Sequence, residues 1–217
     1  MDIKTLCSYV DHTELSPVAK KEDIILLCND ALEYSVASVC VAPSYVKTAA
    51  DHLKGRIKVC TVIGFPNGYS TGAVKVFEAE DAIKNGADEI DMVINQGLLK
   101  DGKYDELEDE IAAVKKVCGN RVLKVIVETC LLSESEIALM CGIVHRAGAD
   151  FIKTSTGFSK CGATPEAVGI MAQNRPQGLK IKAAGGISSL EDAENYIKLG
   201  ADRLGTSRII KIIKSNK

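Results

Sequence analysis

Residues 147–153 read Ala147-Gly148-Ala149-Asp150-Phe151-Ile152-Lys153 and join the end of a helical pattern to a short apolar strand pattern. The triplet Gly-Ala-Asp recurs at residues 86–88 and 200–202, each time before another short apolar run. Glycine suits the left-handed position that follows a helix, and the next two residues then make a tight turn into the strand. The recurring triplet therefore predicts a series of helix-to-strand units.

Apolar runs and longer amphipathic stretches alternate along the whole chain, which is typical of βα units that build a parallel sheet. Eight strands are predicted, at residues 8–13, 37–41, 58–63, 89–94, 122–127, 151–154, 180–183 and 203–205. Helical patterns between them include residues 74–84, 104–117, 134–145 and 190–199. One core can hold a chain of 217 residues. We therefore predict an α/β fold, a single (β/α)8 TIM barrel over residues 1–217 with a short N-terminal helix.

The composition narrows the classes of function. Hydrophobic residues make up 46% of the chain and its formal net charge is −2, so no basic excess favours nucleic acid or an anionic membrane as a partner. The N-terminus lacks a signal-peptide pattern and no apolar run is long enough to span a membrane, which predicts a cytoplasmic protein. The eight cysteines occur singly, without Cys-x-x-Cys pairs, so the pattern predicts neither a zinc site nor a disulfide framework.

The strand register places several residues at one level of the predicted barrel. Asp91, Lys153 and Gly205 each follow the glycine of a Gly-Ala-Asp triplet by five residues, and Cys40 stands at the matching position after Ser35. Alternate strands of an eight-stranded barrel supply the side chains of one interior layer. We therefore expect these four residues near the carboxyl ends of the strands, where barrel enzymes keep their active sites.

Two lysines stand at predicted strand ends, each before small residues. Lys153 precedes a Thr-Ser-Thr-Gly run, and Lys182 precedes Ala-Ala-Gly-Gly. An ammonium group is expensive to bury, and two of them on adjacent strands repel, which favours the neutral, nucleophilic form of one. Asp91 is then a structural counter-ion, a proton-transfer group or both. The alternative for Lys153 is a side chain that extends along the strand edge to water.

Side-chain alternation gives the direction of the residues on these strands. It turns Asp91 inward and Ile90 and Met92 toward the helices. At the end of the first strand, residues 11–13 (Asp11-His12-Thr13) add polar groups to the same rim. His12 is either a hydrogen-bonded structural histidine or an acid or base, whereas His52 and His145 lie in helical patterns and are expected on the surface.

The glycine runs after the last strands predict a different role. Gly185-Gly186 and Gly205-Thr206-Ser207 follow the seventh and eighth strands and precede helical patterns. In this type of barrel, these two loops and a helix N-terminus commonly bind phosphate, because backbone N–H groups approach an anion where side chains are absent. Gly157, after the sixth strand, is expected in the same pocket.

Taken together, these motifs resemble those of the deoxyribose-phosphate aldolase family along nearly the whole chain. The matching stretches are residues 11–13, 39–41, 64–66, 89–95, 151–157, 182–187 and 205–207. The resemblance implies a class I aldolase that reversibly cleaves 2-deoxy-D-ribose 5-phosphate to D-glyceraldehyde 3-phosphate and acetaldehyde, without a metal. It also implies that Lys153 is the Schiff-base lysine, that Lys182 tunes it and takes part in proton transfer, and that Asp91 is the carboxylate of the relay, working through a water.

The predicted substrate site extends beyond these three catalytic residues. We expect it to include Asp11, Thr13, Cys40, Thr154, Gly157, Gly185, Gly186, Gly205, Thr206 and Ser207. The chain departs from the family pattern at Glu14, at Ala42 and at Lys160-Cys161, where Thr-Gly is frequent. Lys160 is expected to add positive charge near the phosphate. The family's tendency to form dimers implies a homodimer.

Two other functions remain open at this point. One is another phosphate-binding barrel, either a transaldolase-like enzyme that acts on a ketose phosphate or a decarboxylase that needs no imine. The other is a sugar-phosphate sensor without catalysis, which the combination of Asp91, Lys153 and Lys182 disfavours. Reduction by borohydride in the presence of acetaldehyde separates these hypotheses, because imine chemistry leaves a covalent adduct on Lys153.

Overall fold

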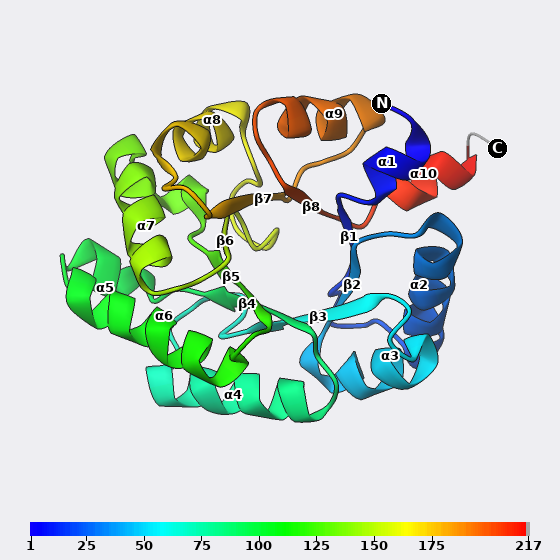
Figure 1. Cartoon of the computed structure of the whole chain (residues 1–217), viewed down its shortest axis with the longest axis horizontal. Helices are drawn as coiled ribbons and strands as arrows, with labels where there is room; N and C mark the ends of the chain where they lie inside the picture. Colours follow the sequence, from blue (N-terminus) through cyan, green and yellow to red (C-terminus); the bar gives the residue numbers. More distant parts are fainter. Residues whose placement is uncertain (216–217) are drawn as a thin grey trace.

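The computed structural model describes residues 1–215, and its eight strands close into a barrel in which each strand runs parallel to its two neighbours (Figure 1). The strands are β1 (Val10–Glu14), β2 (Ser38–Val41), β3 (Lys58–Ile63), β4 (Glu89–Val93), β5 (Val122–Ile126), β6 (Phe151–Lys153), β7 (Lys180–Ala184) and β8 (Arg203–Thr206). This topology confirms the predicted TIM barrel.

Helices surround the ring of strands in Figure 1. They are α1 (Ile3–Cys7), α2 (Lys21–Tyr34), α3 (Val46–Leu53), α4 (Gly72–Lys84), α5 (Gln96–Lys100), α6 (Tyr104–Cys118), α7 (Glu134–Arg146), α8 (Pro165–Asn174), α9 (Leu190–Lys198) and α10 (Ile209–Ser215). Two short 3-10 turns, η1 (Pro43–Tyr45) and η2 (Thr129–Leu131), follow β2 and β5. The short N-terminal helix is therefore confirmed, and no helix in the described part of the chain is long and apolar enough to cross a membrane.

The predicted boundaries are close to the observed ones, and the largest difference lies at the first strand. β1 begins at Val10 rather than at residue 8. The Ser8 hydroxyl donates to the carbonyl of Thr5 and its N–H to the carbonyl of Lys4, so Ser8 completes the last turn of α1. Ser8 and Tyr9, which the apolar pattern assigned to the strand, therefore complete the end of α1.

The Gly-Ala-Asp triplets make helix-to-strand turns as predicted. Gly86, Gly148 and Gly200 have φ angles of +106°, +81° and +108°, a left-handed conformation that glycine adopts without steric cost. The alanine after each glycine donates its N–H to a carbonyl five residues back, which satisfies the end of the preceding helix. These bonds explain why the triplet marks a helix end three times.

The aspartates of the triplets have a function that the sequence pattern did not reveal. The carboxylates of Asp88, Asp150 and Asp202 accept the backbone N–H of the second residue of β3, β5 and β7, at 2.8–2.9 Å. Each carboxylate also pairs with a basic side chain, supplied by Lys58, Lys115 and Arg175 respectively. We call these three residues the aspartate clamps; each fixes an even-numbered strand to its preceding neighbour at the amino ends of the strands.

Side-chain direction along β4 follows the predicted alternation. Ile90 and Met92 are fully buried in the large apolar cluster that packs the helices on the barrel. Asp91 instead makes its contacts with lysines of β5, β6 and β7. The interior of the barrel is therefore polar at this level, and most of the apolar core lies between strands and helices.

Candidate active site

Three predicted residues meet inside the barrel. Lys153 of β6 and Lys182 of β7 each donate to the same atom, Oδ2 of Asp91 on β4, at 2.7 Å. The three side chains are almost completely buried, with exposed fractions of 3%, 0% and 0%. Lys153 and Lys182 are also register partners on adjacent strands. The structure thus brings together the two lysines and the carboxylate that the sequence singled out.

Further charged residues, which the sequence reasoning did not single out, extend this group. Lys124 of β5 lies 2.9 Å from Oδ1 of Asp91 and 2.5 Å from Glu89. Arg203 of β8 contacts Asp11 at 2.6 Å and Glu89 at 3.3 Å. Lys124 stands in the middle of an apolar run, Val122-Leu123-Lys124-Val125-Ile126, and a lysine there is a signal of the same kind as Lys153.

These residues form what we call the buried charge cluster. It contains four cationic side chains and three carboxylates: Lys124, Lys153, Lys182, Arg203, Asp11, Glu89 and Asp91. Loss of one proton from a lysine would therefore leave the cluster electrically balanced. A buried group with one excess cation favours this loss, because an uncompensated charge is expensive in a low-dielectric interior.

The fixed charges of the cluster follow from its geometry. Burial raises the pKa of Asp91, but Lys124, Lys153 and Lys182 outweigh burial and hold that pKa well below its ordinary value. Burial lowers the pKa of Lys182, yet the carboxylates of Asp11 and Asp91 more than compensate and raise it. Lys124 behaves in the same way, with Asp91 as the main opposing charge. Asp91, Lys124 and Lys182 are therefore charged over the whole physiological pH range.

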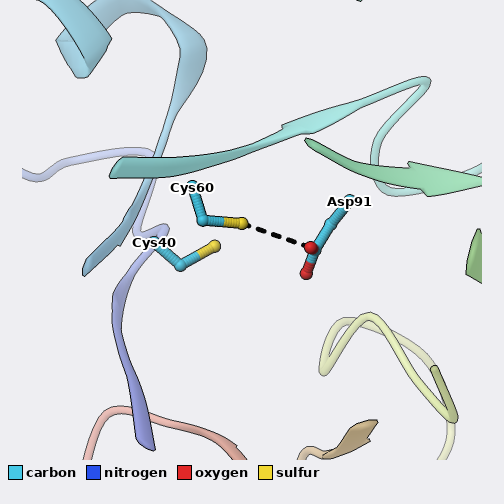
Figure 2. Close-up of side chains that lie close together, drawn as sticks. All are labelled: Cys40, Cys60 and Asp91. Carbon is cyan, nitrogen blue, oxygen red and sulfur yellow. Dashed lines mark hydrogen bonds between the residues drawn. The ribbon is translucent and has the colours of Figure 1, made fainter. Parts of the chain in front are cut away.

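Two cysteines lie beside Asp91, as Figure 2 shows. Cys60 donates to Oδ1 of Asp91 at 3.2 Å, and the sulfur atoms of Cys40 and Cys60 and a carboxylate oxygen all lie within 4.8 Å of one another. This grouping has the donor types of a metal site. However, burial, Cys40 and Asp91 raise the pKa of Cys60, and both oxygens of Asp91 already accept bonds from lysines. A divalent cation would add charge to a cluster that already has excess positive charge.

A cavity of about 510 Å³ opens above this cluster. Lys153 lines it, whereas no other member of the buried charge cluster does so in the described part of the chain. Predicted substrate residues among the lining are Thr13, Gly157, Gly185, Gly186, Gly205, Thr206 and Ser207. Phe158 and two cations that the sequence reasoning missed, Arg208 and Lys211, also line the cavity. Lys153 is therefore the member of the buried charge cluster that reaches the cavity.

The glycine loops come close enough to require glycine. A Cβ atom on Gly162 would lie 2.3 Å from the backbone of Gly185, and Gly185 and Gly186 have φ angles of +80° and +76°. Contrary to the prediction, no helical segment follows Gly186 directly, since α9 begins at Leu190. α10 begins two residues after Ser207. The side of the cavity predicted to bind phosphate thus consists of loop residues and two nearby cations, Arg208 and Lys211.

Three residues predicted to bind substrate lie below the cavity instead of lining it. Asp11 is fully buried and accepts from Ser38, Lys182 and Arg203. Cys40 is 1% exposed, and the Thr154 hydroxyl donates to Ala184 and accepts from its N–H, which ties β6 to β7. The sequence predicted correctly that these side chains point into the barrel, but it did not predict how far they lie from the cavity. They are buried and do not line it.

His12 does not belong to the rim. It is 2% exposed, and its Nε2 lies 3.8 Å from Asp30 of α2, outside the barrel interior. Burial lowers the pKa of His12 to about 4, against the opposing effect of Asp30. His12 does not line the cavity, and its buried Nδ1 has no hydrogen-bond partner among the described residues. His52 is on the surface as expected, paired with Asn29.

We expect His12 to make the protein sensitive to acid. Because its pKa is about 4 in the folded chain and about 6.5 when unfolded, the unfolded state takes up the proton first. Stability is therefore lost as the pH falls from 6.5 toward 4, by up to ~3 kcal/mol. Urea unfolding of wild type and His12→Asn at pH 7.5 and pH 5 measures this. The variant should show a smaller difference between the two pH values; equal differences would contradict the assignment.

Comparison with known proteins gives consistent matches. Residues 5–206 match the model of the DeoC/LacD family of aldolases. A deoxyribose-phosphate aldolase of Streptococcus agalactiae is 58% identical over 217 residues, which cover 100% of this chain and 97% of that protein. The crystal structure of a putative deoxyribose-phosphate aldolase from Coccidioides immitis has a TM-score of 0.95 at 39% identity, covering 100% of this chain and 87% of that one. The deoxyribose-phosphate aldolase of Aeropyrum pernix, described as tetrameric, has a TM-score of 0.92 at 33% identity, with coverages of 100% and 94%.

Proposed function

The chain belongs to the DeoC/LacD family of aldolases, and on that basis we propose that it reversibly cleaves 2-deoxy-D-ribose 5-phosphate to D-glyceraldehyde 3-phosphate and acetaldehyde. The reaction proceeds through an imine on Lys153, without a metal or organic cofactor. The observation that carries the proposal is the position of Lys153, which is held by Asp91 at one end of the cluster and lines the cavity. Residues 1–217 act as one aldolase domain.

Imine chemistry accounts for the cleavage. The neutral amine of Lys153 adds to the C1 aldehyde of the open-chain sugar, and loss of water together with uptake of one proton gives an iminium ion. The iminium accepts the electron pair of the C2–C3 bond as that bond breaks, while the C3 hydroxyl loses its proton. Glyceraldehyde 3-phosphate leaves, and the remaining enamine is protonated at C2 and hydrolysed to acetaldehyde and free Lys153.

Asp91 and Lys182 assist Lys153 without lining the cavity themselves. Both lysines bond to the same oxygen of Asp91, so a proton can pass between them across that carboxylate. Neither Asp91 nor Lys182 lines the cavity, and their contact with the substrate therefore runs through Lys153 or a water molecule. The two interpretations of Asp91, as counter-ion and as relay group, are compatible in this arrangement.

The opposite side of the cavity suits the phosphate. Gly185, Gly186 and Ser207 offer backbone N–H groups, and Arg208 and Lys211 add positive charge. Lys160, which the sequence suggested for this role, is exposed and is not among the residues that line the cavity. The phosphate and the imine are thus held at separate places in one cavity.

We expect Lys211→Ala to raise KM for the phosphorylated sugar about three- to tenfold, with little change in kcat, because one charge that attracts the phosphate is lost. Lys160→Thr removes a nearby exposed cation and is the matched control, with an expected change below about twofold. Steady-state kinetics at low and moderate salt measure both variants. Equal effects of the two substitutions would assign the charge effect to the general surface potential.

Turnover of purified protein with 2-deoxyribose 5-phosphate tests the proposed function. Formation of acetaldehyde and glyceraldehyde 3-phosphate, with much lower rates for unphosphorylated 2-deoxyribose, is the expected result. Exchange of fragments between ketose phosphates would favour a transaldolase-like enzyme instead. Tight binding of the sugar phosphate without products would favour a sensor.

The proposed setting is the catabolism of deoxyribose phosphate in the cytoplasm. The partners of the protein are then small molecules, a sugar phosphate and acetaldehyde, and neither nucleic acid nor membrane is required. We expect a homodimer, although the relative from Aeropyrum pernix is described as a tetramer. The mass of the protein in solution decides between these assemblies.

A further inference from the structure

Two cysteines outside the active site lie side by side on adjacent loops. Cys130 belongs to η2, after β5, and Cys161 belongs to the loop of residues 154–164 between β6 and α8. Their thiols interact with one another, and both side chains line a small cavity of about 170 Å³. The Cys130 sulfur also lies 3.4 Å from the hydroxyl of Ser159. The two loops therefore meet through these side chains.

These thiols differ from the other paired cysteines of the chain in their access to solvent. Cys161 is exposed and Cys130 is partly exposed. Cys40 and Cys60 also lie close together, but they are 1% and 0% exposed inside the barrel. A dissolved oxidant can thus reach the first pair and not the second. Cys161 is also one of the positions at which the sequence departs from the family pattern.

We propose that Cys130 and Cys161 form a reversible disulfide that controls the shape of the substrate cavity. The reaction is exchange with a low-molecular-weight disulfide. One cysteine attacks that disulfide and releases one small thiol; the second cysteine then attacks the mixed disulfide and releases the other. Two protein thiols and one small disulfide become one protein disulfide and two small thiols. The second step is intramolecular, because both cysteines line the same small cavity.

Charge near the pair selects the kind of disulfide. The carboxylates of Glu134 and Glu166 line the same small cavity as the two sulfurs, and Glu128 lies 3.9 Å from the sulfur of Cys130. Negative charge repels an anionic disulfide and attracts a cationic one. Cystamine, which carries two ammonium groups, is therefore the appropriate probe.

The loop that carries Cys161 also forms a wall of the substrate cavity. Phe158, three residues before it, lines that cavity and packs edge-on against Phe65 at 5.3 Å. Gly162 lies directly against the backbone of Gly185, and the N–H of Ala163 donates to Ala184 at 2.9 Å. A movement at Cys161 thus reaches both Phe158 and the glycine loop that we assign to the phosphate.

Disulfide formation requires such a movement. A disulfide bond is about 2.05 Å long, which is far shorter than any noncovalent contact between two sulfur atoms. The start of the loop cannot follow freely, because Thr156 donates its N–H and hydroxyl to the buried carboxylate of Glu128. We therefore expect the backbone of residues 157–163 to move, while Lys153 keeps its position in β6. We expect KM to rise and kcat to change little.

The test uses the full-length protein treated with cystamine and then freed of the reagent. Peptide mapping by mass spectrometry should find residues 130 and 161 cross-linked, with Cys40 and Cys60 still reduced. KM for 2-deoxyribose 5-phosphate should rise by about fivefold with kcat within about twofold, and dithiothreitol should restore it. Cys130→Ser and Cys161→Ser should keep the basal kinetics and lose the response. Cys28→Ala, which removes a buried thiol of α2, should keep the response.

Two results would overturn the proposal: absence of the cross-linked peptide, or a cross-linked protein with unchanged KM. The kinetic part depends on the proposed aldolase function, whereas the peptide map does not. A protein that forms the disulfide but never cleaves the sugar phosphate would contradict the proposed function. The cross-link itself can then be detected by the melting temperature, which should rise by several degrees, because the bond closes a loop that contains α7 and β6.

Discussion

Replacement of Lys153 by methionine is expected to lower kcat for cleavage of 2-deoxyribose 5-phosphate by about 10⁴-fold or more. Methionine fills a similar volume but offers no amine, so the iminium ion that accepts the electron pair of the breaking bond cannot form. No other amine of the buried charge cluster lines the cavity. Turnover assays give the size of the loss, and reduction with borohydride in the presence of acetaldehyde tests its cause. Wild type should gain one ethyl group on Lys153, and the variant should gain none there.

Two control variants separate chemistry from folding. Lys153→Arg keeps a cation beside Asp91, but a guanidinium does not lose its proton at working pH and cannot form the imine. It should be as inactive as the methionine variant, with an unfolding midpoint closer to that of wild type. Lys180→Met removes an exposed lysine at the other end of the neighbouring strand and should leave turnover unchanged. Imine trapping on a different lysine would refute the assignment of Lys153.

Replacement of Asp91 by asparagine is expected to have the largest combined effect on stability and activity. The substitution leaves the ammonium groups of Lys124, Lys153 and Lys182 around a neutral amide, although each now bonds to the carboxylate at 2.7–2.9 Å. Breaking a buried ion pair by removing one partner typically costs about 3–5 kcal/mol. Urea unfolding should show a loss of this size, and turnover should fall by at least about 10²-fold.

A second variant and the pH dependence sharpen this test. Asp91→Asn combined with Lys124→Met removes one of the uncompensated cations, so it should recover part of the stability without recovering turnover. Because the pKa of Asp91 is well below its ordinary value, its stabilising effect is present above about pH 4 and is lost only as the pH falls toward the lowered value. The stability difference between wild type and Asp91→Asn should therefore be constant from pH 5 to pH 8. A wild-type unfolding curve for the variant would refute the role of Asp91 as counter-ion.

Periodicity and turn chemistry predicted the fold because they are local properties. The glycine after each helix and the short apolar run after each turn need only their neighbours to be recognised, and the strand boundaries are mostly within one or two residues of the structure. Asp91 and Lys153 each follow the glycine of a triplet by five residues. In a closed barrel this equal spacing places both side chains at one level, so the sequence predicted that they would meet. Their catalytic roles remain predictions until the variants above are measured.

The missed residues depend on properties that are not local. Lys124 is the register partner of Asp91 on the adjacent strand, and its place in an apolar run was a signal that went unused. Arg203 of β8 reaches across the barrel to Glu89 of β4, and strand alternation does not give that reach. The sequence placed Asp11 on the rim because it is two residues from Thr13. That distance along the strand is enough to put Asp11 in the buried interior while Thr13 lines the cavity. Lys211 lines the cavity from α10, the helix that follows β8, and a sequence pattern does not give the direction in which that helix leaves the strand.

The aspartate clamps have a consequence for how this protein can change. They fasten three pairs of neighbouring strands at the amino ends, through bonds from Asp88, Asp150 and Asp202 to the backbone of β3, β5 and β7. The residues that line the cavity lie at the opposite ends, mostly in loops. Insertions and substitutions in those loops therefore leave the fastening of the barrel untouched. A laboratory seeking new aldehyde acceptors can vary the other loop residues at the mouth of this scaffold, provided that the three clamps, Lys153 and the close-packed glycines are kept.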